Sequence, residues 1–416
     1  MSEELPVASC QPPAGPDTGY RVPDTGYHAE RPDSAALAEE ARSWRSAYVH
    51  IPFCARRCPY CDFAVVAADE AGGLDTGRYV DALVAEISME PDPSAVHAVN
   101  LGGGTPTQLH PDDLERIIVA IDGQFGIADG AEISIEANPE DWTLAYAGDL
   151  RRIGINRVSF GTQSFDPVVL EALGRLHSPR EASEAFAAAR TAGFSNINLD
   201  LIYGTPEETD QSWRRTVEQA IDLEPDHVSV YALTVEGGTA LSRAVLAGAP
   251  EPDPDDQADR YEHFDEVARS AGLVRYEVSN WARPGHACRY NLSTWMMGEF
   301  SSFGTGAHDF RSGVRGRNIR RLDAYLDQVE AGSRPRSGSE RLGEFESERE
   351  RFMVGLRLAS GVRPGSIGGP FVTSGEGRRL VDAGVIDVRD GRVVVLKPLL
   401  TDLVARSVLS VSPDDC

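Results

Sequence analysis

The sequence has no run of apolar residues close to the ~20 that a helix needs to cross a bilayer. Its N-terminus, MSEELPVASCQPP, lacks the basic and apolar regions of a secretory signal peptide. Hydrophobic residues make up 41% and charged residues 25% of the 416 residues, which is ordinary for a globular protein. These features predict a chain without a transmembrane segment and with a cytoplasmic location.

Cysteines are also few, and the chain carries no excess of positive charge. Half of the six cysteines fall within eight residues, which is unlike a disulfide framework, and such a group in a reducing compartment more often binds metal. The formal net charge is −25, so a nucleic-acid partner is disfavoured, because phosphate contacts need an excess of Lys and Arg.

The first two segments of the chain differ sharply in composition. Residues 1–43 are rich in Pro, Gly, Asp and Glu and are predicted to form a disordered leader. Across residues 44–235, strand-like and helix-like patterns alternate, which implies parallel strands joined by crossover helices. The expected strands are Ala47–Pro52, Val96–Gly103, Ala131–Asn138, Arg157–Gln163, Asn196–Tyr203 and His227–Leu233, and the clearest helical patterns cover 78–90, 111–125 and 179–193. Six such units predict an α/β fold, an incomplete parallel (β/α)6 TIM-like barrel.

Two further regions follow the predicted barrel. Residues 236–334 are less regular, and we interpret them as a barrel extension that lines the pocket, with a helix near 259–271 and a strand near 274–282. Residues 335–416 contain a helix near 346–358, another near 375–383 and a hairpin over 385–396. That order resembles a winged helix, so a small C-terminal α+β domain is expected. Its nearly balanced charge makes DNA binding the weaker interpretation.

Cys54, Cys58 and Cys61 directly follow the first expected strand, in a Cys-x3-Cys-x2-Cys spacing. Three thiolates on one loop can bind three corners of a [4Fe–4S] cluster and leave the fourth iron open. An open iron can take the amine and carboxylate of S-adenosylmethionine, which is the source of a radical when an electron arrives. The alternative is a zinc site of three cysteines with His50 or another histidine, but zinc fingers usually use a second, distant cysteine pair. The spacing therefore predicts the cluster.

The segment YVHIPFCARRCPYCDF (48–63) resembles the signature of radical S-adenosylmethionine proteins. It is most similar to the oxygen-independent coproporphyrinogen III oxidase family, which includes a haem-chaperone branch. The similarity runs over roughly residues 45–405, through NLGGGTPTQL (100–109), GINRVSFGTQSFD (154–166) and INLDLIYGTP (197–206).

The resemblance implies a set of contacts to S-adenosylmethionine: Tyr48, Tyr60, Gly103, Gly104, Thr105, Glu136, Gln163, Arg175, Asp200 and Ala232. The glycine run would contact the methionine moiety, and Arg175, in the helical segment after the fourth strand, would pair with the carboxylate. Taken singly, Glu136, Gln163 and Asp200 could equally be capping or solvated residues. All three lie near the ends of adjacent strands, the edge where parallel barrels build active sites, which favours ligand contacts.

The resemblance leaves functions of different classes open. The enzyme branch carries a further cysteine two positions after the third, whereas this chain has Phe63 there, as in the chaperone branch. The preferred hypothesis is therefore a chaperone that binds haem and passes it to an acceptor protein. The alternatives are an oxygen-independent coproporphyrinogen III dehydrogenase, or a diverged radical enzyme with another substrate. An electron donor is a further expected partner, and the sequence indicates no oligomeric state.

The haem-binding motif of the chaperone branch, His-Asn-x-x-Tyr-Trp, is altered here. Asn291 and Trp295 match it, but Tyr290 replaces the histidine and Thr294 replaces the tyrosine. A phenolate can bind haem iron, so Tyr290 is a candidate ligand, and a packed phenol without an iron contact is the alternative.

Other residues could also serve a tetrapyrrole. His308, in GTGAHDF (304–310), is a second candidate iron ligand, with His286 and Cys288 nearby in sequence. The basic run RSGVRGRNIRR (311–321) could meet porphyrin propionates, although an exposed loop is the more common reason for such a run.

Overall fold

The computed structural model describes residues 32–68, 75–91 and 94–413, so most of the predicted leader, residues 1–31, lies outside the described residues. Within these ranges, twelve strands form one sheet in the order β14-β13-β12-β11-β1-β4-β5-β6-β7-β8-β10-β9. All six predicted strands are present and run parallel, side by side. They are β1 (Ser46–Ile51), β4 (Val96–Gly103), β5 (Ile127–Ala137), β6 (Arg157–Gln163), β7 (Ile197–Tyr203) and β8 (His227–Ala232).

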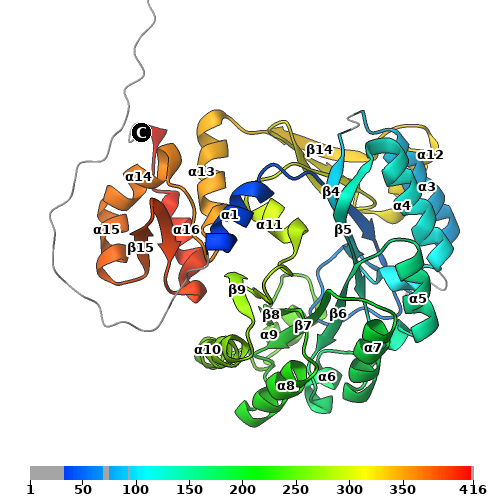
Figure 1. The fold of residues 1–416 in the computed structure, drawn as a ribbon, viewed down its shortest axis with the longest axis horizontal. Helices are drawn as coiled ribbons and strands as arrows, with labels where there is room; N and C mark the ends of the chain where they lie inside the picture. Colours follow the sequence, from blue (N-terminus) through cyan, green and yellow to red (C-terminus); the bar gives the residue numbers. More distant parts are fainter. Residues whose placement is uncertain (1–31, 69–74, 92–93, 414–416) are drawn as a thin grey trace, which may run out of the picture.

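Helices cover the outer face of this curled sheet (Figure 1). They are α3 (Thr76–Ser88), α4 (Pro111–Phe125), α5 (Leu144–Arg152), α6 (Pro167–Ala172), α7 (Pro179–Thr191) and α8 (Asp210–Asp222), with α9 (Ala240–Leu246) and α10 (Pro254–Ser270) after β8. Proline in the first turn and side-chain caps fix their starts: Ser178 and Glu181 form a capping box at α7, for example. The helices predicted over 78–90, 111–125, 179–193 and 259–271 are therefore confirmed.

Each parallel strand presents apolar side chains outward and polar side chains inward. Leu199 and Leu201 of β7, for example, lie in the main hydrophobic cluster with the helices, whereas Asn198 and Asp200, which alternate with them along the strand, line a cavity. Because strand side chains alternate between the two faces, one short segment serves both environments. The interior of this incomplete barrel is thus polar, unlike the packed apolar interior of a closed barrel.

Further strands, all but one of them antiparallel to their neighbours, extend the sheet at both ends. Beyond β1 lie β11 (Phe300–Phe303), which is parallel to β1, and then β12 (His308–Arg311), β13 (Val314–Asn318) and β14 (Arg336–Arg341). Beyond β8 lie β10 (Asn280–Ala282) and β9 (Val274–Glu277), while helix α12 (Leu322–Glu330) packs on α3. Figure 1 shows α11 (Arg289–Trp295) between β4 and β9, on the open side of the curled sheet. The predicted fold class, an incomplete parallel barrel, is confirmed.

The C-terminal part has its own hydrophobic cluster, built around Phe352, Phe371 and Val393. It contains α13 (Glu344–Gly355), α14 (Gly365–Thr373), α15 (Gly375–Asp382), the hairpin β15 (Ile386–Arg389) and β16 (Arg392–Val395), and α16 (Thr401–Val408). The expected helices and hairpin are present, and α14 and α16 were not foreseen. The predicted domain starts at residue 335, but β14 pairs with β13 in the main sheet, so residues 336–341 join the barrel extension instead.

Helix α1 (Pro32–Ala41) lies inside the range that composition marked as disordered. It is ordered because Ala38 and Ala41 bury themselves with Trp44 against Leu292 and Met296, around α11. The C-terminal part also touches α1, since Arg363 and Arg392 both pair with Glu39. Among the described residues, none of the helices has the length and apolar character needed to span a membrane.

Candidate functional site: a cysteine loop above a polar cavity

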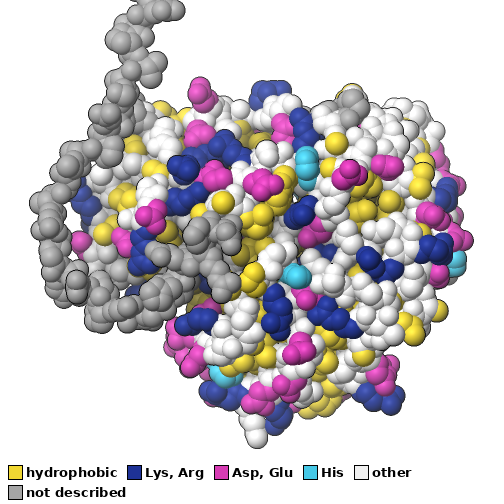
Figure 2. All heavy atoms as spheres, viewed as in Figure 1, with side chains coloured by type: hydrophobic (Ala, Val, Ile, Leu, Met, Phe, Trp, Pro, Cys, Tyr) yellow, Lys and Arg dark blue, Asp and Glu magenta, His cyan; other side chains and the backbone are white. Residues whose placement is uncertain are grey.

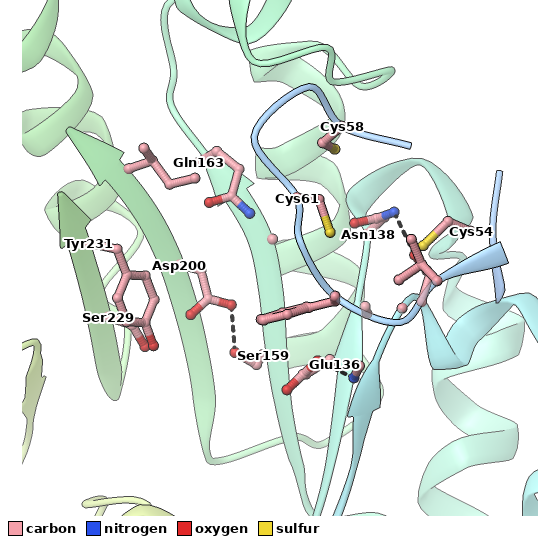
Figure 3. A pocket seen from close by; sticks show the side chains of 18 of the residues that line it. Cys54, Cys58, Cys61, Glu136, Asn138, Ser159, Gln163, Asp200, Ser229 and Tyr231 are labelled. Atoms are coloured by element: carbon pink, nitrogen blue, oxygen red, sulfur yellow. Dashed lines mark hydrogen bonds between the residues drawn. The ribbon is translucent and has the colours of Figure 1, made fainter. Parts of the chain in front are cut away.

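The three clustered cysteines lie on the loop that follows β1, above the carboxyl ends of the parallel strands (Figure 3). A two-stranded pairing of β2 (Phe53–Cys54) with β3 (Val66–Ala67) ties the two ends of the loop together. All three thiols are free and half-buried. The loop therefore holds three sulfur donors at the mouth of the barrel.

Neighbouring side chains orient two of these sulfurs. The hydroxyl of Thr105 donates to Cys54 Sγ at 3.6 Å, and Arg175 Nη1 donates to Cys58 Sγ at 3.5 Å. Burial raises the pKa of the Cys54 thiol to about 11, and burial also raises that of Cys61. Thiols in this environment become thiolates when a metal supplies positive charge, which is the property expected of cluster ligands.

The donor set fits a cluster better than a single zinc ion. In the part of the chain that the structure describes, no three His, Cys, Asp or Glu side chains gather closely enough to hold one metal ion. A cubane cluster takes one thiolate at each of three separate corners, so its ligands need not converge on one point. His50 is not available as a fourth zinc ligand, because its Nδ1 lies 3.0 Å from the Tyr48 hydroxyl and its Nε2 lies 2.9 Å from the Ala64 carbonyl oxygen.

A cavity of about 520 Å³ opens below the cysteine loop and reaches into the barrel. This volume lies within the range of ordinary ligand pockets, about 300–1,000 Å³. All ten residues expected to contact S-adenosylmethionine line it: Tyr48, Tyr60, Gly103, Gly104, Thr105, Glu136, Gln163, Arg175, Asp200 and Ala232. Figure 3 shows Glu136, Asp200 and Gln163 on neighbouring strands, facing the space below Cys61. The structure therefore brings the whole predicted set together, and their individual roles stay predictions.

The glycine run at the end of β4 is packed against the protein itself. Gly103 has φ +108°, and a Cβ there would lie 2.3 Å from His50 Nδ1. A Cβ at Gly104 would meet the backbone of Pro52 at 2.7 Å. These glycines let β4 approach β1 and the start of the cysteine loop, a close approach for which only glycine has room. Both glycines also line the cavity, so their expected contact with the methionine moiety stays a prediction.

Arg175 does not lie in a helix as expected. It sits in the loop between α6 and α7, where Nη2 donates to Asn138 Oδ1 at 2.5 Å and to the Gly161 carbonyl at 2.9 Å. Asn138 in turn donates to Thr105 Oγ1 at 3.1 Å. Gly174 just before it has φ +68° and no room for a Cβ beside Pro59, so the sequence LGRL forms a turn rather than a helix. The guanidinium thus ties the cysteine loop to β5 and β6.

Glu136 is a buried acid of the cavity with a strongly raised pKa. Burial raises its pKa to about 7, and the negative charge of Asp200 adds to the effect, although Gly103 N–H donates to Oε2 at 3.0 Å. Burial likewise raises the pKa of Asp200, which accepts from Ser159 Oγ at 2.8 Å (Figure 3). Buried carboxylic acids of this kind favour a cationic or hydrogen-bonding ligand nearby.

Below the acids, the barrel floor carries polar residues that sequence reasoning missed. Asn198 donates to Ser159 Oγ at 2.5 Å and to Ser229 Oγ at 3.0 Å, and its Oδ1 lies 2.6 Å from His227 Nδ1. Arg157, at the start of β6, also lines the cavity. The available signal was the alternation within the strands, such as the polar positions of INLDLI and HVSVY, since an inward polar face is unusual for parallel strands.

Only two of the four haem candidates reach the cavity. Tyr290 and Asn291 line it, and the ring of Tyr290 stacks on that of Tyr48 at 6.0 Å between centroids. Burial raises the pKa of the Tyr290 phenol, so the phenolate form is disfavoured. Trp295 does not line the cavity; Arg357, which follows α13, lies over its ring at 4.7 Å. His308, exposed on β12, is not a lining residue either.

The basic run 311–321 is also absent from the lining of the cavity. Arg311 pairs with Glu90, Arg315 pairs with Glu350 and Arg321 pairs with Asp323 at 2.7 Å, while Arg320 donates to the carbonyl of Asp62. Figure 2 shows Lys and Arg interspersed with Asp and Glu over the visible face of the molecule. The arginines of the run therefore form ion pairs and hydrogen bonds within the protein, and Arg311, Arg315 and Arg317 belong to the paired strands β12 and β13 rather than to the expected exposed loop.

The fold and the cysteine loop define the class of the protein. Residues 48–220 match the model of the radical SAM superfamily. The coproporphyrinogen III oxidase HemN from Escherichia coli, described as a radical SAM enzyme, has the same fold, with a TM-score of 0.76 over 92% of this chain and 93% of that chain at 22% identity. The chain is a radical SAM protein, and this family implies a [4Fe–4S] cluster and S-adenosylmethionine as its cofactors.

Relatives of higher identity define the family more closely. The chain is 39% identical over 368 residues to the heme chaperone HemW of Mycobacterium tuberculosis, covering 87% of this chain and 94% of that protein. It is 32% identical over 326 residues to the heme chaperone HemW of Bacillus subtilis, covering 76% of this chain and 84% of that protein. The chain therefore belongs to the HemW family.

Proposed function

We propose that this protein is a haem chaperone: it holds a [4Fe–4S] cluster on Cys54, Cys58 and Cys61, binds haem in the cavity below, and transfers it to an acceptor protein. The observation that carries the proposal is the convergence of the cysteine loop and of Tyr290 and Asn291 on one cavity. The names of the relatives, heme chaperones in several bacteria, support the same function. The proposal includes a cytoplasmic location and an electron donor for the cluster.

Three groups of residues around the cavity would have separate roles. The three thiolates would hold the cluster, whose open iron would take the amine and carboxylate of S-adenosylmethionine. Arg175 and Thr105 would hold the sulfurs of the loop in place through their contacts to Cys58 and Cys54. The buried acids Glu136 and Asp200 would bind the polar groups of the cofactor farther inside.

Phe63 favours a chaperone over a dehydrogenase. It is 60% exposed and lines the mouth of the cavity, two positions after the third cysteine of the loop. A phenyl ring at this position offers an apolar surface to a flat ligand and has no thiol chemistry.

The first test is the cluster itself. After anoxic reconstitution, the wild type should contain about four irons and four sulfides per chain, and the alanine variant of any one of the three loop cysteines should lose most of them. Cys288→Ala is the matched control, because this thiol is not on the cysteine loop and donates to Glu132 at 3.5 Å. A zinc-loaded wild type, or full iron content in the loop variants, would contradict the cluster.

The second test separates chaperone from enzyme. Reconstituted protein is given S-adenosylmethionine, a reductant and coproporphyrinogen III, and is separately titrated with haem. We expect haem binding at one equivalent and no protoporphyrinogen. Formation of protoporphyrinogen would overturn the chaperone function in favour of the dehydrogenase, and absence of haem binding would overturn it as well.

A further inference from the structure

Arg157 is a cation buried at the floor of the cavity. It is the first residue of β6, it pairs in register with Ser134 of β5, and its side chain points inward; the pairing of β6 with β7 begins one residue later, with Val158 opposite Ile197. Only 4% of its surface is exposed, yet it belongs to the cavity lining. A buried guanidinium is costly unless a partner compensates its charge, so its contacts are informative.

Among the described residues, the guanidinium of Arg157 has few hydrogen-bond acceptors. Nη1 donates to Ser134 Oγ at 3.0 Å, while Nε is buried and has no acceptor. No ion pair to Arg157 is formed within the described part of the chain. Burial opposes its charge, but the nearby Cys288 and Glu132 raise its pKa, so the side chain remains a cation.

The acids closest to Arg157 are engaged elsewhere. Glu132 Oε1 accepts from Arg289 N–H at 3.0 Å and from the Cys288 thiol at 3.5 Å. Asp200 accepts from Ser159 Oγ at 2.8 Å and from Asn198 Nδ2 at 2.9 Å. Neither forms an ion pair with Arg157. The site thus presents guanidinium hydrogen-bond donors to the cavity without an acceptor fixed against them.

The floor lies far from the cluster. Arg157 and Gln163 stand at opposite ends of β6, and six residues of strand span about 20 Å. The carboxylate of S-adenosylmethionine, expected at the open iron above the strands, is therefore not the anion for Arg157. The cavity walls between the two ends include the aromatic rings of Tyr48, Tyr231 and Tyr290.

We infer that Arg157 is the anchor for a carboxylate of the ligand carried in this cavity, and that for a tetrapyrrole this carboxylate is a propionate. A guanidinium binds carboxylates in a forked geometry, and the tyrosine rings suit a flat macrocycle above it. This inference rests on the proposed function. It assigns to the barrel floor the propionate contact that the basic run 311–321, outside the cavity, does not make.

The test compares haem with haem dimethyl ester, whose propionates cannot carry charge. In spectrophotometric titrations of the full-length wild type, the ester should bind at least tenfold more weakly, which corresponds to about 1.4 kcal/mol. In Arg157→Gln, haem and its ester should bind equally, and Arg157→Lys should restore part of the preference. Arg289→Gln is the control, because its guanidinium donates outside the cavity to the Gly130 carbonyl, and it should discriminate as the wild type does.

The possible outcomes distinguish failure of the carboxylate subsite from failure of the chaperone function. Equal binding of haem and ester by the wild type would overturn the carboxylate subsite and leave the chaperone function standing. A wild-type preference that persists in a folded Arg157→Gln, checked by circular dichroism, would remove Arg157 from that role. Absence of haem binding by the wild type would overturn both.

Discussion

Replacing Glu136 by glutamine should stabilise the cofactor-free protein, and the gain should grow with pH. Burial raises the pKa of this carboxyl to about 7, from 4.5. Because the pKa is higher in the folded than in the unfolded state, the folded state holds the proton more tightly. The stability that goes with that proton is present at low pH and is lost as pH rises through about 7.

The size of the effect follows from the same two pKa values. By the linkage relation, the raised pKa of Glu136 lowers the free energy of unfolding by about 2 kcal/mol at pH 6 and by about 3 kcal/mol at pH 8.5. Glutamine keeps the shape and can still accept from Gly103 N–H, but it carries no charge to desolvate. The stability gap between variant and wild type should therefore widen by roughly 1 kcal/mol across this range.

The assay is urea denaturation of wild type and Glu136→Gln at both pH values, without added cofactors. Glu181→Gln is the control, because hydrogen bonds from Ser178 lower the pKa of Glu181 and its replacement should bring no gain at high pH. The reasoning would be refuted by a gap that stays constant between pH 6 and 8.5, or that narrows. S-adenosylmethionine binding by Glu136→Gln should be weakened at the same time.

Three further substitutions test the packing around the site. Gly103→Ala should lower the free energy of unfolding by about 3 kcal/mol because its Cβ would collide with an imidazole, whereas Gly126→Ala, with φ +76° and open space, should cost only about 1 kcal/mol in the same urea titrations. Tyr290→Phe should retain haem binding within about twofold while Tyr290→Ala should lose it, because the phenyl variant keeps the ring that stacks on Tyr48 and burial disfavours a phenolate ligand; loss in both variants would restore the phenolate as a ligand. Arg357→Ala should destabilise the protein by about 2 kcal/mol, because it removes both the contact with Trp295 and the ion pair with the buried Glu277 at 3.7 Å, and it should leave haem affinity unchanged; a large change in haem affinity would place Trp295 in the haem site after all.

Local chemistry explains the predictions that the structure confirmed. The six parallel strands are short, rich in branched residues and bounded by turn residues, so each could be located without knowledge of its partners. Cys54, Cys58 and Cys61 are close in sequence, so one loop had to bring them near one another. Polar residues at strand ends predicted the cavity lining because parallel strands place those ends at one edge.

The departures came from contacts between distant segments. Helix α1 is ordered by burial against α11, far along the chain, and no local signal reveals this. Strand β14 joins the main sheet through pairing with β13, although its polar sequence RSGSER gives no strand pattern of its own. Arg175 looked helical because its turn depends on the fit of Gly174 against Pro59.

By itself, the sequence determined the cofactor chemistry and the repeating strand–helix order, since both depend on residues within a few positions of one another. Only the tertiary structure decided which polar residues share the cavity, that Trp295 and His308 lie outside it, and that Arg157 stands at its floor without a fixed anion. The physical reason is that burial and charge compensation are properties of three-dimensional neighbours, which strands far apart in the chain supply.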